Sequence, residues 1–214
     1  MKKVLLTIAL VAAAATSAFA QPTLGAGYVN NQATTTVGNS ISTSTTNGFY
    51  VEGGYGIPLA GAFSVTPAIR YTFLGSSKDN GIVVFGQSLS GSSKLIEHYV
   101  GIPIMLDYGF DIGGVAKISL FAGPTFNYGV SSKLTTSASA NILGISLGTG
   151  NSVSDLYDGG NYNRFDVLVG GGIGVEIENV GLKVGYHYGV LDRYASDNSS
   201  LHDAQLLIGA TLKF

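Results

Sequence analysis

The stretch LHDAQLLIGATLKF, from Leu201 to Phe214, decides the fold class. From Ala204 on, every second residue in it is apolar, and the residues between are mostly polar or small. A period of two indicates a β-strand with one apolar face. The same alternation recurs along the chain, and no other segment is suited to cover the apolar faces. We therefore predict a closed sheet whose apolar face lies against lipid. The apolar set of this strand, counted back from the last residue, is Phe214, Leu212, Ala210, Ile208, Leu206 and Ala204.

The first twenty residues have the features of a secretory signal peptide. Lys2 and Lys3 precede a short apolar run, and Ala18 and Ala20 supply the small residues of a cleavage site. The run is too short to span a membrane as a helix, which needs roughly 20 apolar residues. We expect a cleaved signal peptide over residues 1–20 and one domain over residues 21–214. No Cys follows the cleavage site, which excludes a lipid-anchored lipoprotein.

The composition excludes several classes of protein. The chain has 11 basic and 13 acidic residues and no Cys. It therefore lacks the basic surface of a nucleic-acid-binding protein, a disulfide framework and any thiolate metal site. Only 11% of the residues are charged, while 31 are Gly and 22 are Tyr or Phe, from counts of 12 and 10. This combination, without a long apolar helix after the signal, is typical of a membrane β-barrel.

Eight segments show the alternation, and the connections between them are alternately long and short. Long extracellular loops and short periplasmic turns produce this pattern in bacterial outer-membrane barrels. We therefore predict an all-β fold, an eight-stranded antiparallel up-and-down membrane β-barrel. The predicted strands are residues 23–29, 49–57, 63–73, 95–108, 115–128, 162–178, 181–190 and 201–214. The predicted long loops are residues 30–48, 75–93, 129–161 and 191–200, and the short turns are 58–62, 111–114 and 179–180.

Two of the long connections contain apolar runs, at residues 82–85 and 142–147. Such a run is either the extension of a hairpin above the membrane or an apolar tip that docks a partner. We favour the extension in both cases, because Asp79-Asn80-Gly81 before the first run is a turn signal. If the hairpins extend in this way, the strand count rises from eight towards ten.

The outward aromatic residues fall near the two ends of the strands, as expected for girdles at the two membrane interfaces. A soluble lipid-binding barrel of the lipocalin type is the alternative. It would turn the apolar face inward, bury Phe214 and expose the charged set. The predicted outer girdle is Tyr28, Phe49, Tyr71, Phe73, Phe126, Tyr128, Phe165 and Tyr188, and the inner girdle is Tyr55, Phe63, Tyr108 and Phe214.

The inward face of the predicted barrel is rich in charge of both signs. An unpaired charge in a narrow interior costs several kcal/mol, so we expect these residues to pair. An eight-stranded barrel has an interior that side chains just fill, which favours a salt-bridged plug over a pore. The predicted lumen charge network is Glu52, Arg70, Glu97, Asp107, Lys117, Arg164, Asp166, Glu176, Lys183, His187, Asp203 and Lys213.

No catalytic or metal-binding motif is found. His98, His187 and His202 fit no hydrolase or metal-ligand spacing, and the glycine run at Gly170 lies inside a strand with no helix after it. We interpret His187 as a member of the charge network. His98 falls on the outward face, so it lies near an interface or the register shifts at Gly101 or Pro103. We expect no enzymatic activity and no cofactor.

The second half of the chain carries four loose motifs. They are YVGIPIMLDY at Tyr99–Tyr108, FAGP at Phe121–Pro124, NRFD followed by GGGIGVEI at Asn163–Ile177, and GYHYG at Gly185–Gly189. Together, over roughly residues 95–214, they resemble the PorT-like outer-membrane β-barrel family. The architecture is similar to that of the OmpX and OmpA barrels. The resemblance implies the barrel fold, and some members of that family assist a protein secretion machine.

The sequence therefore predicts an integral barrel of the bacterial outer membrane with a plugged polar interior, four extracellular loops and a structural or interaction role. The alternative is a component of a transport or protein-secretion assembly. The expected partners are outer-membrane lipid, other envelope proteins that meet the loops, and the barrel-assembly machinery, but no nucleic acid. The assembly signal would be the C-terminal Phe214 with Leu212 and Ala210.

Overall fold

The computed structural model describes residues 21–84, 87–142, 145–158, 160, 162–194 and 198–214. The predicted signal peptide, with Ala18 and Ala20, lies outside the described residues. Within them, no helix is long and apolar enough to cross a membrane. The described chain is built from nine strands. They are β1 (Gln21–Val37), β2 (Ser40–Pro58), β3 (Phe63–Val84), β4 (Gln87–Ile112), β5 (Ala116–Ile142), β6 (Ile145–Asp155), β7 (Phe165–Ile177), β8 (Val180–Gly189) and β9 (Ser199–Lys213).

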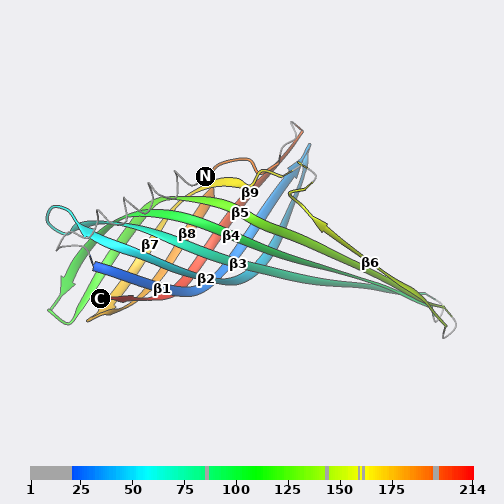
Figure 1. The fold of residues 1–214 in the computed structure, drawn as a ribbon, viewed down its shortest axis with the longest axis horizontal. Coiled ribbons are helices and arrows are strands. Elements are labelled where there is room, and N and C mark those ends of the chain that lie inside the picture. Colours follow the sequence, from blue (N-terminus) through cyan, green and yellow to red (C-terminus); the bar gives the residue numbers. More distant parts are fainter. Residues whose placement is uncertain (1–20, 85–86, 143–144, 159, 161, 195–197) are drawn as a thin grey trace, which may run out of the picture.

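Eight of these strands close into a ring. Each strand pairs antiparallel with the next, β5 pairs with both β4 and β7, and β9 returns to pair with β1. The ring order is therefore β1-β2-β3-β4-β5-β7-β8-β9, and β6 lies outside it as a partner of β5 alone. Figure 1 shows the strands side by side around this ring. The predicted eight-stranded meander is confirmed.

The predicted faces of the strands are also confirmed. Along β9 the apolar set points outward, with Leu212 47% exposed, while Asp203 on the other face is 4% exposed. The outer aromatic residues form a row, because Phe49 pairs with both Tyr28 and Phe73. The exposed apolar belt runs around the whole ring, so lipid is the medium that can cover it.

The interior contains an apolar cluster that the charge pattern did not predict. Val29 and Leu74 are fully buried, and Tyr50, Tyr99 and Leu207 pack with them. Leu168 on β7 is also 1% exposed. Each of these apolar residues stands alone among polar residues on the inward face, so the sequence pattern does not predict that it is buried. The interior is therefore a mixed core, in which apolar packing surrounds the charged groups.

The prediction that residues 30–48, 75–93 and 129–161 are loops is wrong for most of their length. β1 and β2 stay paired up to Val37 and Ser40, around a turn in which Gly38 has a φ of 57°. β3 and β4 stay paired up to Val84 and Gln87, and β5 and β6 form a further hairpin. Polar Ser and Thr side chains indicate that a segment is solvated, but the backbone still satisfies its hydrogen bonds by strand pairing.

The favoured hairpin extension is confirmed for the two apolar runs as far as they are described. Residues 82–84 belong to β3, while 142, 145 and 147 belong to β5 and β6. Phe85 and Leu143 lie outside the described residues. The extension adds one strand, β6, to the eight of the ring.

Outside the ring the sheet splits into two arms. Pairing between β2 and β3 ends at Asn47 and Gly75. The first arm consists of residues 33–37 of β1, 40–46 of β2 and 199–203 of β9. The second arm consists of residues 76–84 of β3, 87–95 of β4, 133–142 of β5 and all of β6. Figure 1 shows the two arms extending in different directions, with the second arm the longer.

The short turns lie at the opposite end from the arms, together with both ends of the described chain. The Phe214 N–H donates to the Pro22 carbonyl at 3.0 Å. The turn between β7 and β8 has only two residues, and its first, Glu178, has a φ of 55°. This end corresponds to the predicted periplasmic side, so the arms project from the outer face.

Candidate functional site

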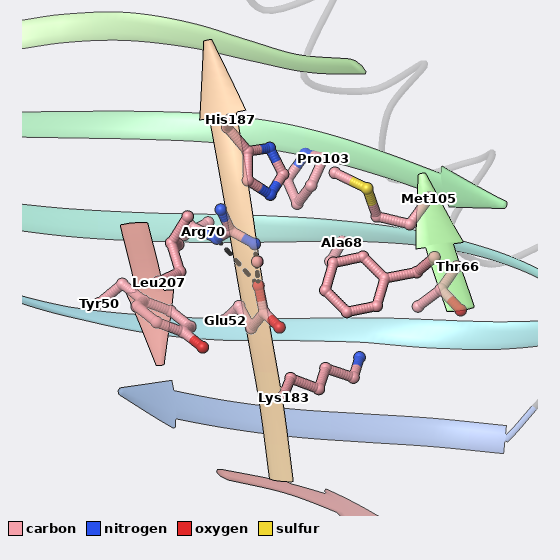
Figure 2. Close-up of a pocket in the computed structure, with 12 residues that line it drawn as sticks. Tyr50, Glu52, Thr66, Ala68, Arg70, Pro103, Met105, Lys183, His187 and Leu207 are labelled. Carbon is pink, nitrogen blue, oxygen red and sulfur yellow. Dashed lines mark hydrogen bonds and ion pairs between the residues drawn. The ribbon is translucent and has the colours of Figure 1, made fainter. Parts of the chain in front are cut away.

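The middle of the barrel is occupied by an ion pair between neighbouring strands. Arg70 on β3 donates to Glu52 on β2 through Nη2 at 2.7 Å and Nε at 2.9 Å. The Arg70 guanidinium also lies 5.0 Å from the centre of the Tyr50 ring. Figure 2 shows this pair with His187 and Lys183 pointing into the same cavity. The cavity has a volume of about 30 Å³, enough for one or two waters and no larger solute.

Phe121 closes the barrel next to this pair. The Lys183 ammonium lies 5.7 Å from the centre of the Phe121 ring. Two glycines make room for the ring, because a Cβ atom at Gly172 or Gly185 would lie 2.6 Å or 3.1 Å from its Cζ atom. The inward glycines therefore leave space for a large side chain that crosses the lumen, and the middle of the barrel is filled.

The outer mouth is organised around Arg193, which is only 4% exposed. Its Nη1 atom forms an ion pair with Asp203, and its Nη2 atom lies 3.7 Å from Glu97 and donates to the Tyr157 hydroxyl at 3.2 Å. The Arg193 guanidinium also lies 5.4 Å from the centre of the Tyr99 ring. One cation thus joins two carboxylates and two tyrosines across the mouth.

Arg193 belongs to a connection that was predicted to be a polar loop. Its carbonyl accepts from the Asn163 N–H at 2.8 Å, and its own N–H donates to the Leu201 carbonyl at 3.0 Å. Beside it, Tyr194 bridges to Tyr162, with hydroxyls 3.2 Å apart. The described residues of segments 156–158, 162–164 and 190–194 therefore cover the outer mouth, and the buried Arg193 guanidinium holds them there.

The groups around Arg193 at the outer mouth keep its guanidinium charged, and burial keeps Tyr157 and Tyr162 neutral. Burial alone would lower the pKa of Arg193, but Tyr99, Asp203 and Glu97 around it raise that pKa well above its usual range. Burial raises the pKa of Tyr162 to about 12, and the hydrogen bond with Tyr194 acts in the same direction. Burial also raises the pKa of Tyr157. The cover therefore keeps its charges and hydrogen bonds at neutral pH.

The inner mouth is more open. Glu176 forms an ion pair with Lys213, and Asp107 accepts from the Thr66 hydroxyl at 2.8 Å. Lys117 and Lys183 line the same cavity, which has a volume of about 300 Å³ and opens towards the short turns. This cavity shares Thr66 and Lys183 with the small cavity at the Glu52–Arg70 pair.

The expectation that every inward charge pairs with another is only partly met. Glu52 pairs with Arg70, Glu176 with Lys213, and Asp203 and Glu97 with Arg193. Within the described chain no ion pair is formed by a second group of predicted residues. This group comprises Asp107, Lys117, Arg164, Asp166, Lys183 and His187.

For three of these residues the structure shows contacts other than ion pairs. Asp166 accepts from the Val167 N–H at 2.7 Å. Arg164 precedes β7 instead of lying within a strand, and it donates to the Gly129 and Val130 carbonyls at 3.2 and 3.0 Å. His187 is 2% exposed and lines the middle cavity, with no hydrogen-bond partner for Nδ1 among the described residues.

Arg193 was missed by the reasoning from sequence because it lies outside the alternating segments. A signal for it was present, since the predicted network has one more carboxylate than Lys and Arg together. That excess indicated a further buried cation, and Arg193 is a basic residue close to the start of the last strand.

His98 faces outward in the row of outer aromatics, as predicted. Its Nδ1 atom lies 2.6 Å from the Tyr71 hydroxyl, and its ring meets the edge of the Phe73 ring at 5.4 Å. The register shift on β4 occurs between His98 and Tyr99, opposite β5. A shift at Gly101 or Pro103 is therefore wrong, and the position of His98 at the interface stays a prediction.

The described residues contain no group of three His, Cys, Asp or Glu side chains that could hold a metal ion. The closed antiparallel ring, its apolar outer belt and its filled polar interior define a membrane β-barrel of the bacterial outer membrane. Residues 17–194 match the family described as outer membrane protein beta-barrel domain, and the chain belongs to this family.

Three solved structures are similar to this chain at low sequence identity. Ail of Yersinia pestis, solved with the heparin analogue sucrose octasulfate, is 14% identical, with 92% of this chain and 99% of that chain covered and a TM-score of 0.43. Neisserial surface protein A is 17% identical, with coverages of 89% and 97% and a TM-score of 0.41. The outer membrane enzyme PagL is 10% identical, with coverages of 86% and 98% and a TM-score of 0.39. No curated protein matches the chain.

Proposed function

We propose that this protein is a non-enzymatic interaction barrel, which uses the outer membrane as an anchor and its two arms as contact surfaces. The observation that carries the proposal is the contrast between its interior and its outer face. The lumen is filled at the middle by Arg70, Glu52 and Phe121 and covered at the outer mouth by Arg193. The strands nevertheless continue well beyond the ring as regular sheet.

The filled lumen argues against a transport pathway through the barrel. The 30 Å³ cavity between the two mouths is too small for a hydrated ion or a metabolite. Among the described residues each inward carboxylate is bound by an Arg, Lys, hydroxyl or backbone N–H group, and no group of three His, Cys, Asp or Glu side chains could hold a metal ion. We therefore propose that the protein acts without a cofactor and does not bind nucleic acid.

A second candidate is a component of a transport or protein-secretion assembly. The loose motifs over residues 95–214 support it, because they resemble the PorT-like family, some members of which assist secretion. In that role the arms or the short turns would contact other envelope proteins. We further propose that the barrel-assembly machinery recognises Phe214, Leu212 and Ala210, of which Leu212 and Ala210 lie on the lipid face of β9 and Phe214 follows that strand.

The test is affinity purification of the tagged protein from mildly solubilised outer membranes, followed by mass spectrometry. Recovery of the barrel without a stoichiometric envelope partner supports the self-standing interaction barrel. Recovery in a fixed ratio with other envelope proteins supports the assembly component instead. Conductance of single barrels in a planar bilayer tests the filled lumen, and steady ion-selective currents would contradict the self-standing interaction barrel.

A further inference from the structure

The outer half of β2, residues 40–46, presents a free strand edge. β2 pairs with β1 on one side from end to end, but its pairing with β3 stops at Asn47 and Gly75. Beyond that point nothing among the described residues bonds to the second side. Residues 40–45 are all exposed, and Ile41 is 73% exposed. Half of the backbone N–H and C=O groups of residues 40–45 therefore point into solvent, while Thr46 at the base of the edge is buried.

Natural proteins normally protect such edges with charged residues, Pro or a β-bulge. Residues 40–46, Ser-Ile-Ser-Thr-Ser-Thr-Thr, contain no charge and no Pro. The register with β1 runs without interruption over the whole hairpin, so no bulge twists the edge away. The facing edge on β3 differs, because Lys78 and Asp79 lie in it. The β2 edge is thus a regular and unprotected template for another strand.

A second copy of the chain in the same membrane fits this edge poorly. All copies cross the membrane in the same direction, so two β2 strands run the same way. A twofold axis parallel to the strands places each residue of one β2 edge opposite the same residue of the other copy. Each backbone N–H then faces an N–H, and each C=O faces a C=O. Hydrogen bonding along a strand edge needs N–H groups opposite C=O groups. An extended segment from a different protein can meet that requirement.

We infer that residues 40–46 of β2 form a docking edge for an extended segment of another protein, which adds to the first arm as an extra strand. Backbone hydrogen bonds supply the affinity in this mode, and side chains at alternate positions supply the selectivity. The edge is uncharged, so the segment it takes is an uncharged, β-forming sequence. This inference rests on the proposed interaction function and names the way in which the partner binds.

The experiment selects peptides from a random displayed library on the folded barrel in detergent micelles, with empty micelles as counter-selection. The edge variant Thr43→Lys with Thr45→Lys places two charges on the free strand. Its matched control is Gln32→Lys with Thr34→Lys on β1. These residues pair directly with Thr45 and Thr43, but β1 is also bonded to β9 on its other side.

We expect selected peptides with uncharged, β-forming sequences. They should bind the control variant like the wild type and bind the edge variant at least about fivefold more weakly, because two cross-strand contacts are lost. Hydrogen exchange should slow at alternate amides of residues 40–46 when peptide is bound. The inference is overturned if no peptide is enriched, if both variants bind equally, or if cross-linking at position 43 traps a second copy on the edge. A partner found by purification that binds the edge variant normally would leave the proposed function intact and remove this inference alone.

Discussion

The ring and the two arms are built from the same strands, yet different forces hold them. In the ring, apolar residues on the outer face meet lipid and the interior is filled, so every strand is covered on both sides. In the arms the strands are rich in Ser and Thr, most described side chains are exposed or half-buried, and backbone pairing provides most of the order. Strand pairing therefore continues beyond the segments in which alternating apolar residues indicate a strand.

The largest expected effect is at Arg193, which connects the segments outside the membrane to the ring. Arg193→Met leaves Glu97 and Asp203 buried without their cation. Removing one partner from a buried ion pair costs about 3–5 kcal/mol. We expect a loss of that size in the free energy of unfolding, measured by reversible urea unfolding in lipid vesicles.

The control for Arg193 is the variant in which the network is neutralised altogether. Arg193→Met combined with Glu97→Gln and Asp203→Asn removes the unpaired charges and should recover most of the stability. A loss below about 1 kcal/mol in the single variant would show that the buried network does not hold the outer mouth.

The next prediction compares a charge placed on the lipid-facing surface of the ring with the same charge placed on an arm in water. Ile173 on β7 and Val153 on β6 are both exposed, at 47% and 66%. Ile173→Arg places a charge against lipid near the middle of the belt and should cost about 2–4 kcal/mol in vesicles. Val153→Arg places the same charge in water and should change stability by no more than about 0.5 kcal/mol. Equal losses in the two variants would contradict the proposed position of the membrane.

A smaller effect is expected when the first arm is shortened. Gln32 and Thr45 pair directly, so residues 33–44 can be replaced by Asn-Gly, which favours a two-residue hairpin turn. The ring strands and their register are unchanged. The shortened barrel should still migrate differently in gels before and after boiling, with a free energy of unfolding within about 1 kcal/mol of the wild type. Loss of the mobility shift would mean that the arm is needed to close the ring.

The smallest effect is expected in the turn between β7 and β8. Glu178 has a positive φ of 55°, a conformation that glycine adopts without steric cost. Glu178→Gly should raise the free energy of unfolding by about 0.5 kcal/mol, since relief of strain is partly offset by entropy. Glu178→Ala keeps the Cβ atom and should give no gain, and a gain in the alanine variant would assign the effect to charge instead.

The sequence by itself determined the ring. The alternation in segments such as residues 201–214 placed the inward and outward faces correctly, because a period of two is a local property of a strand. It also placed Glu52 and Arg70 on one face, and their pairing across neighbouring strands followed from the order of the meander.

Only the tertiary structure decided the arms, the apolar residues in the lumen and the role of Arg193. Residues 30–48 carry no hydrophobic alternation because polar side chains occupy both faces, so the pattern could not distinguish a strand from a loop there. Leu168 is buried among polar positions, and Arg193 reaches Glu97 and Asp203 from a connecting segment. These contacts join residues far apart in the chain, and their stability depends on burial that arises only when the ring has closed.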